Sequence, residues 1–503
     1  MQKRFFALLL CAVMLVLCVG CGGSENPSDT QTGADVPPDP PLLREMQHRY
    51  LTVWSWQIPD PALAEVYAQK AVECGFTAVD LGVQWSAFEP LRGHFDWSWL
   101  DRVVKAFTDK GLGVSLQPLL WSKDLSWAEE LAFQETVDGV FSVEERGSFV
   151  SFTDGNTLNV LKNTLQNFAL HALSYGGKLT RWGVRLSAFG EFDYSVSAEL
   201  DFSESSAVAF RDYIRENYDS VTALNEASGL TVASWSDLNN LSCADLAKAC
   251  RLDWRLYRQQ CLTEMQALVS GIFRSADKDV PIVFSLGNFG NGMNNGYSGV
   301  VDLWQVCQGD FDILSVALSR DVDAAMTLSV ASSLCDKKLA VEVDGAGVWD
   351  EGDEVAVKDL VKVCGAYDVF SLATANFTAE QLDAHKSTLQ TYETLLSSFT
   401  PSVKDGDPTK AILIFTHAVV QTLPPVSYEA LYRDAWDAAS EQGARRVRFV
   451  TDGQVGKNAA LLKDVTDLSF GTVKGKIPVA QGFAAAVKDL PLAFDGLEFV
   501  AEE

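Results

Sequence analysis

Residues 77–121 read TAVDLGVQWSAFEPLRGHFDWSWLDRVVKAFTDKGLGVSLQPLLW and contain the unit that the rest of the fold repeats. Two short apolar runs, 77–85 and 113–121, enclose a longer stretch at 98–111 that has helical periodicity. The helical stretch ends at Gly111, and a glycine directly after the last helical residue is a common helix end. This order predicts two parallel strands joined by a crossover helix.

The same alternation continues on both sides of this unit. Apolar runs that predict strands occur at 51–56, 77–85, 113–121, 181–187, 281–287, 311–318, 338–344 and 367–373. Further helices are predicted at 60–75 and 157–176, with a closing helix at 378–398. Eight strand–helix units predict an α/β fold, a (β/α)8 TIM barrel. A doubly wound open sheet is the alternative, but it explains the count of eight less well.

The chain changes character after the barrel. A polar, proline-containing stretch at 400–410 interrupts the pattern, and an apolar run at 411–417 and a helix at about 427–442 follow. We therefore predict a barrel domain over residues 47–400 and a small α/β domain over residues 409–503. No glycine-rich phosphate loop follows any predicted strand, so the sequence gives no support to nucleotide binding.

The N-terminus has the pattern of a bacterial lipoprotein signal peptide. A short basic start precedes an apolar run, Phe5–Val19, which is too short to cross a bilayer as a helix of about 20 residues. Gly20 and Cys21 then resemble a lipobox. We expect residues 1–20 to be cleaved and Cys21 to carry the lipid. An ordinary signal peptide and a buried apolar helix are the alternatives.

A polar tether is predicted over residues 21–46. It is rich in Gly, Ser, Pro and acidic residues and lacks the apolar side chains that could form a core. The lipid on Cys21 would be the protein's only membrane contact. We expect the protein in the cell envelope, facing the periplasm or the exterior, and Gly22 in place of Asp favours the outer membrane where one is present.

Charge and cysteine content exclude several classes of protein. The chain has a net charge of −27 and no basic stripe, which excludes a nucleic-acid partner. Such acidity disfavours polyanionic ligands in general but names no substrate. Seven cysteines follow Cys21, an odd number without a CxxC pair, so we expect neither a disulfide framework nor a zinc site. Cys243 and Cys250 alone are close enough in sequence for a local bridge, which stays open.

Two glutamates mark the candidate chemistry. In a TIM barrel the functional side chains lie at the C-terminal ends of the strands. Glu191 follows the fourth predicted strand, and Glu342 lies near the end of the seventh, inside the apolar run LAVEV. Burying a carboxylate in such a run is costly unless it is paired or takes part in chemistry. A structural salt bridge is the alternative for each glutamate taken alone.

Other side chains at the same end are candidates for substrate binding. Tryptophans stack on sugar rings, although a single tryptophan more often packs in a core. The candidates near the predicted strand ends are Trp54, Trp85, Trp121 and Trp349. Arg185, Asn288 and Tyr297 are candidates for hydrogen bonds that support the carboxylates or the substrate.

Residues 81–117 resemble the second barrel unit of the clan A glycoside hydrolases, and most closely that of the family 42 β-galactosidases. A Trp-Ser and a Glu-Pro precede a Gly, an Asp and a Leu-Asp helix start. Residues 210–230, FRDYIRENYDSVTALNEASGL, also resemble that family. The likeness extends over roughly residues 49–400.

This resemblance implies a glycosidase acting on β-linked sugars with retention of configuration. It assigns the general acid/base to Glu191 and the nucleophile to Glu342. The cysteine-rich zinc cluster of some family 42 enzymes is not visible in this sequence, so no metal is implied, and we expect no cofactor. The clan usually has Asn before the acid/base, whereas this chain has Gly190, which implies weaker transition-state stabilisation or a substrate held differently.

Two other readings stay open. One is a non-catalytic carbohydrate-binding lipoprotein with a degenerate hydrolase barrel. The other is an inverting hydrolase, because the Gly-Glu pair at residues 190–191 also resembles that of the β-amylases. The sequence specifies neither the sugar nor the oligomeric state.

Overall fold

We describe a computed structural model of the chain. The described residues are 48–187, 190–195, 197–286, 295–318, 323–345, 354–367, 369–390, 410–416, 428–440, 447–463, 465–470, 473–488, 490, 492, 494 and 496–501. The predicted signal peptide, Cys21 and the tether lie outside these residues. Arg44 to Glu503 form one compact unit. The division of this unit into a barrel and a second domain stays a prediction.

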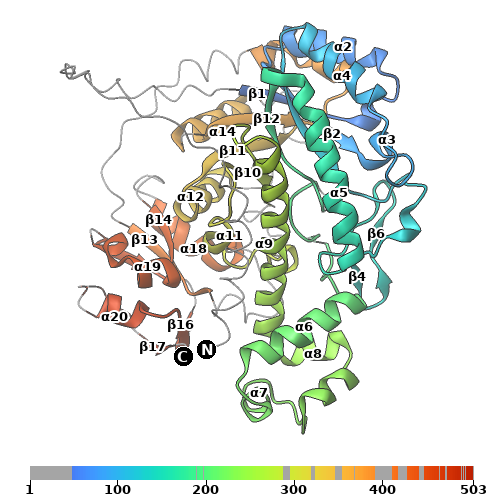
Figure 1. The fold of residues 1–503 in the computed structure, drawn as a ribbon. Helices are drawn as coiled ribbons and strands as arrows, with labels where there is room; N and C mark the ends of the chain where they lie inside the picture. Colours follow the sequence, from blue (N-terminus) through green and yellow to red (C-terminus); the bar gives the residue numbers. More distant parts are fainter. Residues whose placement is uncertain are drawn as a thin grey trace, which may run out of the picture. The chain divides into compact units, whose positions relative to one another are not determined.

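Eight parallel strands form the central sheet. They are β1 (His48–Trp54), β2 (Ala78–Gln84), β3 (Gly113–Leu119), β8 (Leu179–Trp182), β9 (Val283–Ser285), β10 (Ile313–Leu318), β11 (Lys338–Asp344) and β12 (Ser371–Ala375). Their order is β8-β3-β2-β1-β12-β11-β10-β9, and a parallel bridge between Trp182 and Ile282 joins the two outer strands. The sheet therefore closes into a barrel, which confirms the predicted TIM fold (Figure 1).

The strand ends differ from the prediction in places that have a physical cause. β1 stops at Trp54, because the Gln57 side chain accepts a hydrogen bond from the Trp54 N–H and the chain turns into a 3-10 helix, Ser55–Gln57. The fourth strand ends at Trp182, although the N–H groups of Gly183 and Arg185 still donate to the carbonyls of Leu116 and Pro118 on β3, at 3.2 and 3.1 Å. The last strand begins at Ser371, after the preceding helix has run to Ala366.

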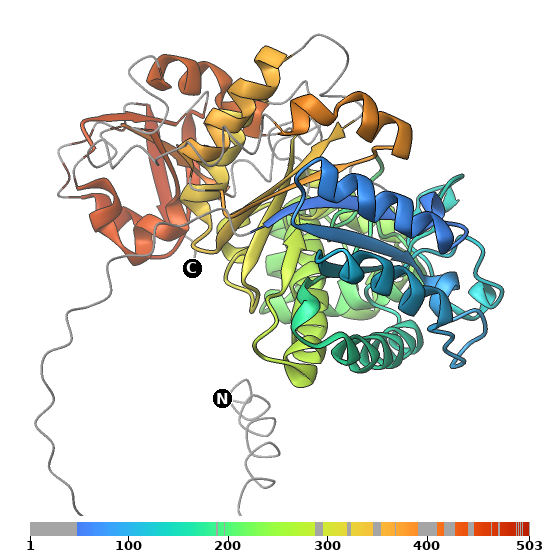
Figure 2. The ribbon, with the colours of Figure 1, turned by 90° about the horizontal axis from the view of Figure 1, so that it is seen from above.

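Helices cover the outside of the barrel, as the two views show (Figure 1; Figure 2). The longer ones are α2 (Ala62–Glu73), α4 (Ser98–Asp109), α5 (Gly155–Ala172), α6 (Glu204–Asn217), α7 (Val221–Ser228), α9 (Arg251–Ala276), α12 (Ala324–Leu334) and α14 (Glu354–Ala366). Shorter ones are α3 (Trp85–Phe88), α8 (Cys243–Ala249), α10 (Asn295–Ser298), α11 (Leu303–Val306) and α15 (Ala379–Ala384). None of the helices in the described residues is long and apolar enough to span a membrane.

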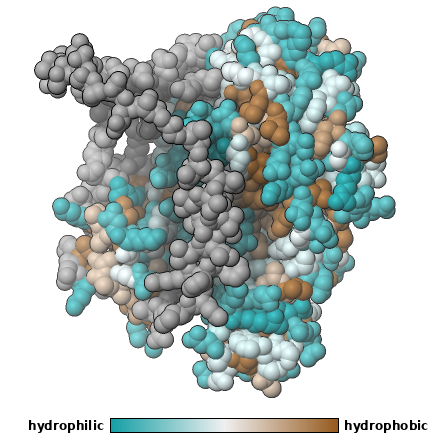
Figure 3. Space-filling model, in the orientation of Figure 1, coloured by the Kyte–Doolittle hydropathy of each residue, from teal (hydrophilic) through white to brown (hydrophobic). Residues whose placement is uncertain are grey.

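The pattern of α4 shows why these segments pack as helices. Leu100, Val103, Val104 and Phe107 are buried and recur at intervals of three and four residues, so they share one helix face. The opposite face carries charged residues such as Lys105. On the face of the molecule drawn in Figure 3, hydrophilic side chains likewise prevail over the coloured helices, with apolar patches between them.

Two hairpins lie in the long connection between β3 and α5. The first pairs β4 (Glu135–Thr136) with β5 (Gly139–Val140), and the second pairs β6 (Ser142–Val143) with β7 (Gly147–Ser148). Trp121, two residues beyond β3, forms an antiparallel bridge with Phe149. This bridge brings the second hairpin next to the C-terminal end of the barrel.

The C-terminal part contains a second parallel sheet. Its strands are β14 (Val447–Thr451), β13 (Lys410–Ile414) and β15 (Asp467–Ser469), in that order, and a separate pair joins β16 (Gly475–Val479) to β17 (Leu497–Ala501). The helices of this part are α18 (Tyr428–Ser440), α19 (Asp452–Lys457) and α20 (Phe483–Val487). A hydrogen bond of 3.2 Å from the Ser329 hydroxyl to the Val447 carbonyl links it to α12.

The cysteines among the described residues are free and buried. Cys243 begins α8 and Cys250 follows its last residue, and the local bridge between them that the sequence left open is not formed. Burial raises the pKa of both thiols to about 12.

The interior of the barrel is polar at the level of Asp80. This carboxylate, on β2, accepts hydrogen bonds from the Ser115 hydroxyl at 2.5 Å and the Gln117 amide at 2.6 Å. The guanidinium groups of Arg181 and Arg185 lie 3.2 and 3.5 Å away, and all of these side chains are buried. One buried anion therefore stands between two buried cations.

We predict that Asp80→Asn lowers the free energy of unfolding by about 3–5 kcal/mol, because it leaves the buried Arg181 without its anion and removes one of the two anions beside Arg185. Urea titration measures this change. Asp109→Asn is the matched control, since Asp109 forms an exposed pair with Lys105 whose loss costs about 1 kcal/mol or less. Equal losses in the two variants would contradict the assigned role of Asp80.

Candidate active site

Glu342 points into the polar interior from β11. Its neighbours in register on β10 and β12 are Ala317 and Ala373, whose small side chains leave room for it. Arg185 donates two hydrogen bonds to its carboxylate, at 2.6 and 3.2 Å, and the Thr52 hydroxyl donates a third at 3.3 Å. Such a two-point pair fixes the plane of a carboxylate as well as its position. The side chain remains 13% exposed, so it is accessible to a ligand.

Arg185 itself is buried and fully engaged. Its Nε donates to Gln117 at 2.6 Å, one Nη donates to the Gly190 carbonyl at 2.8 Å, and the guanidinium lies 4.9 Å from the ring centroid of Trp54. Burial disfavours its charge, but the carboxylate of Glu342 outweighs burial and raises the pKa of Arg185 above its ordinary value. The positive charge beside Glu342 is therefore permanent.

Glu191 is held by a tight turn after β8. The backbone N–H groups of Leu186 and Ser187 both donate to the Glu191 carbonyl at 3.0 Å. The Ser187 hydroxyl donates to the Glu191 carboxylate at 2.9 Å and accepts from the Glu191 N–H at 3.1 Å. The residue is only 8% exposed. The turn thus presents the carboxylate without leaving it open to bulk water.

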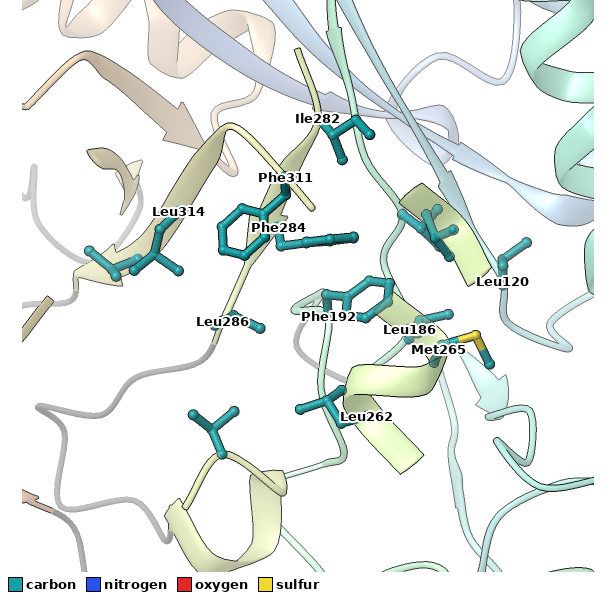
Figure 4. Packing of buried hydrophobic residues seen from close by; sticks show 14 of the residues in the cluster. Leu120, Leu186, Phe192, Leu262, Met265, Ile282, Phe284, Leu286, Phe311 and Leu314 are labelled. Atoms are coloured by element: carbon teal, nitrogen blue, oxygen red, sulfur yellow. The ribbon is translucent and has the colours of Figure 1, made fainter. Parts of the chain in front are cut away.

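Phe192, the residue after Glu191, packs in the core and holds this turn in place. The Phe192 N–H donates to the Ser285 carbonyl at the end of β9. The Phe192 ring lies 4.3 Å from that of Phe284, which in turn lies 5.3 Å from that of Phe311. Figure 4 shows these rings packed with Leu186, Leu262 and Met265. Apolar packing on one side of the turn therefore fixes the position of Glu191 on the other.

The two carboxylates have unlike surroundings. Burial raises the pKa of Glu191 above 4.5, opposed by the hydrogen bond from Ser187 and the charge of Arg185 and reinforced by the charge of Glu342. Glu342, in contrast, has its charge neutralised by direct contact with Arg185. A carboxyl group whose pKa is raised, together with a second one that is ion-paired, is the arrangement that general acid and nucleophile roles require.

Gly190 has a structural explanation. Its φ of +87° lies in the left-handed region, where residues with side chains are strained. A Cβ atom on it would lie 3.2 Å from an Nη of Arg185 and 3.6 Å from the ring of Trp54. The backbone conformation is therefore the main reason for glycine here, and Arg185 adds a tight contact that an Asn side chain at this position would have to relieve.

Three tryptophans form a stack at the end of β1 and β3. The rings of Trp54 and Trp56 lie 5.1 Å apart and nearly parallel, and those of Trp56 and Trp121 lie 6.0 Å apart. The Trp54 ring nitrogen donates to the Asn376 side chain at 2.9 Å. Trp54 and Trp121 are buried, whereas Trp56 is 41% exposed. Trp56 is therefore the ring that a ligand can reach.

Trp85 and Tyr297 are not brought to this site. Trp85 is 1% exposed, and its ring nitrogen donates to Glu89 at 2.7 Å, so it packs in the core beside α3. Tyr297 accepts a hydrogen bond from Arg258 through its backbone carbonyl in α10, and no described contact joins it to Glu342. Asn288 and Trp349 lie outside the described residues.

Several site residues were not predicted. Trp56 falls at the end of the predicted strand 51–56, whereas the structure places it in the 3-10 helix that follows β1. Thr52, Asp80 and Gln117 are polar residues within otherwise apolar strands, and this interruption was the available signal. No group of three or more metal-ligating side chains occurs in the described part of the chain.

Comparison with known proteins confirms the resemblance predicted from the sequence. A glycoside hydrolase family 42 model, described as β-galactosidase, matches residues 57–119. The β-galactosidase bgaB of Geobacillus kaustophilus is 23% identical over 226 residues, which cover 42% of this chain and 32% of that protein. β-Galactosidase BbgII of Bifidobacterium bifidum is 26% identical over 176 residues, which cover 33% of this chain and 24% of that protein. The chain thus spans about a third or less of these curated relatives.

Solved structures share the fold. A β-galactosidase from Halorubrum lacusprofundi superposes with a TM-score of 0.65 at 15% identity, covering 90% of this chain and 72% of that one. A β-galactosidase from Rahnella sp. R3 superposes with a TM-score of 0.66 at 15% identity, covering 91% of this chain and 72% of that one. The catalytic domain of a β-amylase from Paenibacillus polymyxa superposes with a TM-score of 0.56 at 16% identity. This superposition covers 70% of the present chain and 99% of the β-amylase domain. The barrel is therefore similar to those of clan A glycoside hydrolases, close to family 42.

We predict that Glu191→Gln raises the melting temperature at pH 8 and that this gain vanishes near pH 4. The folded-state pKa of Glu191 lies above its unfolded value of 4.5, so folding favours the protonated form, and stability falls as pH rises through the folded pKa. Glutamine imitates the protonated acid and does not ionise. Thermal melts at both pH values, with exposed Glu129→Gln as the control, measure this, and a lower melting temperature of Glu191→Gln at pH 8 would refute it.

Proposed function

We propose that this protein is a glycoside hydrolase that acts on β-linked sugars with retention of configuration, in the manner of a β-galactosidase. The observation that carries the proposal is the pair of carboxylates in opposite environments, one ion-paired with Arg185 and one buried in a tight turn. The family resemblance of the barrel supports the choice of reaction. A carbohydrate is then the natural partner of the exposed Trp56 ring.

In the first step, Glu191 donates its proton to the departing glycosidic oxygen while a Glu342 oxygen attacks the anomeric carbon. The bond from that carbon to the leaving oxygen breaks, and an ester to Glu342 forms. In the second step, Glu191, now ionised, takes a proton from water, whose oxygen displaces Glu342. Each carboxyl group returns to its starting state.

Arg185 and Thr52 act as positioning residues for this chemistry. They hold both oxygens of Glu342, so the nucleophile needs no rotation before attack. Arg185 also donates to the carbonyl of Gly190, directly before the acid/base residue. One guanidinium group therefore sets the position of the nucleophile relative to the turn that carries Glu191.

An inverting hydrolase is a second candidate. The specific observation in its favour is the structural likeness to a β-amylase catalytic domain. The superposition covers 99% of that domain. In such an enzyme Glu342 would activate a water rather than attack the sugar. A carbohydrate-binding protein without turnover is the third reading, and Gly190 is the residue that favours it.

We predict that a 2-fluoro-β-galactoside with a good leaving group forms a stable ester on Glu342. The fluorine slows both steps, but the leaving group restores only the first, so the intermediate accumulates. Peptide mapping by mass spectrometry locates the label. A label on another carboxylate, such as Glu89 or Glu351, would show that the nucleophile is misassigned.

Two variants sharpen this test. Glu342→Gln should reduce turnover by several orders of magnitude, whereas Glu191→Ala should retain more activity on aryl glycosides whose departure needs little protonation. The exposed Glu129→Gln serves as the control and should turn over like the native protein.

We further propose that the protein acts at the cell envelope, held by lipid on Cys21. The signal-peptide pattern of residues 1–20 and the polar tether support this placement. Cys21→Ser should then move the protein from the membrane fraction to the soluble fraction or block its processing. A native protein found wholly in the soluble fraction would refute the anchor.

A further inference from the structure

Arg146 lies at the tip of the hairpin formed by β6 and β7, beside the tryptophan stack. Its guanidinium carbon is 4.9 Å from the ring centroid of Trp121 and 5.9 Å from that of Trp56. Contacts of this kind hold a guanidinium against an aromatic face and leave its edge free for hydrogen bonds. Arg146 and the exposed Trp56 therefore form one surface.

Two hydrogen bonds to the segment after Trp121 hold the β6–β7 hairpin in place. The Lys123 N–H donates to the Arg146 carbonyl at 3.1 Å, and the Ser148 N–H donates to the Ser122 hydroxyl at 2.7 Å. Gly147 has a φ of +74°, and a Cβ atom on it would lie 2.5 Å from the Ser122 hydroxyl oxygen. Only glycine fits this close approach. The arginine is thus presented by a rigid turn and not by a free loop tip.

Arg146 has no anionic partner among the residues that the structure describes. No salt bridge joins it to any described carboxylate, and its buried Nε has no hydrogen-bond partner there. Other arginines of this site behave differently, since Arg181 and Arg185 are both ion-paired. In a chain with 67 acidic and 40 basic residues, a partly buried arginine without an ion pair among the described residues requires an explanation.

The position of Arg146 connects it with the proposed catalytic residues. Trp56 stacks on Trp54, and Trp54 lies against Arg185, which binds Glu342. Burial lowers the pKa of Arg146, while the negative charges of Glu145 and Glu191 act in the opposite direction. Arg146 is therefore close enough to Glu191 for their charges to interact, without a direct ion pair.

We propose that Arg146 binds an anionic substituent of the sugar chain, either the carboxylate of a uronic acid or a sulfate ester, next to a ring that contacts Trp56. A guanidinium edge matches the two oxygens of either group. The substrate would then be an acidic glycan. This inference rests on the proposed glycosidase function, because it assigns a substrate class to that same site.

The charge of the whole protein makes this recognition selective. A chain of net charge −27 disfavours polyanions in general. An acidic glycan is then bound only where a local cation compensates the repulsion. A neutral glycan can accept hydrogen bonds from Arg146 but forms no ion pair with it, so the residue favours the acidic class of substrate.

The test compares neutral β-galacto-oligosaccharides with counterparts that carry a 6-sulfate or a uronic acid. Calorimetric binding and kcat/KM are measured for the native protein, Arg146→Gln, Arg146→Lys and the control Lys162→Gln, which removes an exposed charge on α5. We expect the native protein to prefer at least one acidic class over neutral chains by about 10- to 100-fold. Arg146→Gln should abolish the preference, Arg146→Lys should keep part of it, and Lys162→Gln should keep all of it. Added salt should weaken only the acidic ligands.

The outcomes separate this inference from the proposed function. Equal affinity for neutral and acidic chains, or a preference that survives in Arg146→Gln, overturns the inference even if hydrolysis occurs. Arg146-dependent binding of an acidic chain without turnover supports the inference while refuting the glycosidase. A preference for sulfate alone or uronate alone identifies the source of the anion. If Arg146→Gln does not fold, the native protein is compared with Arg146→Lys instead. The inference then requires a weaker preference for acidic chains in Arg146→Lys than in the native protein.

Discussion

The ion pair between Arg185 and Glu342 is the interaction on which the site depends. A buried guanidinium is tolerated only when its donors and its charge are satisfied. Arg185 meets this requirement with Gln117, the Gly190 carbonyl and Glu342, and it lies 3.5 Å from Asp80. Gln117, Asp80 and Glu342 come from three different strands, β3, β2 and β11, so the site is assembled only when the barrel closes.

The guanidinium group of Arg185 contacts two unusual features of the sequence, the glutamate in an apolar strand and the glycine before Glu191. A glutamate inside an apolar strand is costly alone, but Glu342 has its counter-ion and sits between two alanines. Gly190 has a φ of +87°, which favours glycine, and its carbonyl accepts a hydrogen bond from Arg185. The same packing brings Trp54 against Arg185 and exposes Trp56 beyond it. The proposed nucleophile and the aromatic surface therefore share one support.

The barrel was predictable because hydrophobic periodicity alone separates strands from helices, and the eight apolar runs correspond to the eight strands. Glu191 and Glu342 could be proposed because barrel strands carry function at their C-terminal ends. The tryptophans show where this rule stops. The chain turns into a 3-10 helix at Ser55 and into α3 at Trp85, so Trp56 becomes exposed while Trp85 becomes core. Local turns decide which way a ring points, and periodicity does not encode them.

Two features could be found only in the structure. The pairing of Arg185 with Glu342 depends on the register of the barrel strands. The contact of Arg146 with Trp56 and Trp121 depends on how the β6–β7 hairpin packs against residues that are distant from it in the sequence.

The most direct test of the account is the configuration of the first product released from a β-galactoside, followed by proton NMR before mutarotation. Nucleophilic attack by Glu342 followed by water predicts that the β-anomer appears first. Initial release of the α-anomer would contradict the covalent role assigned to Glu342.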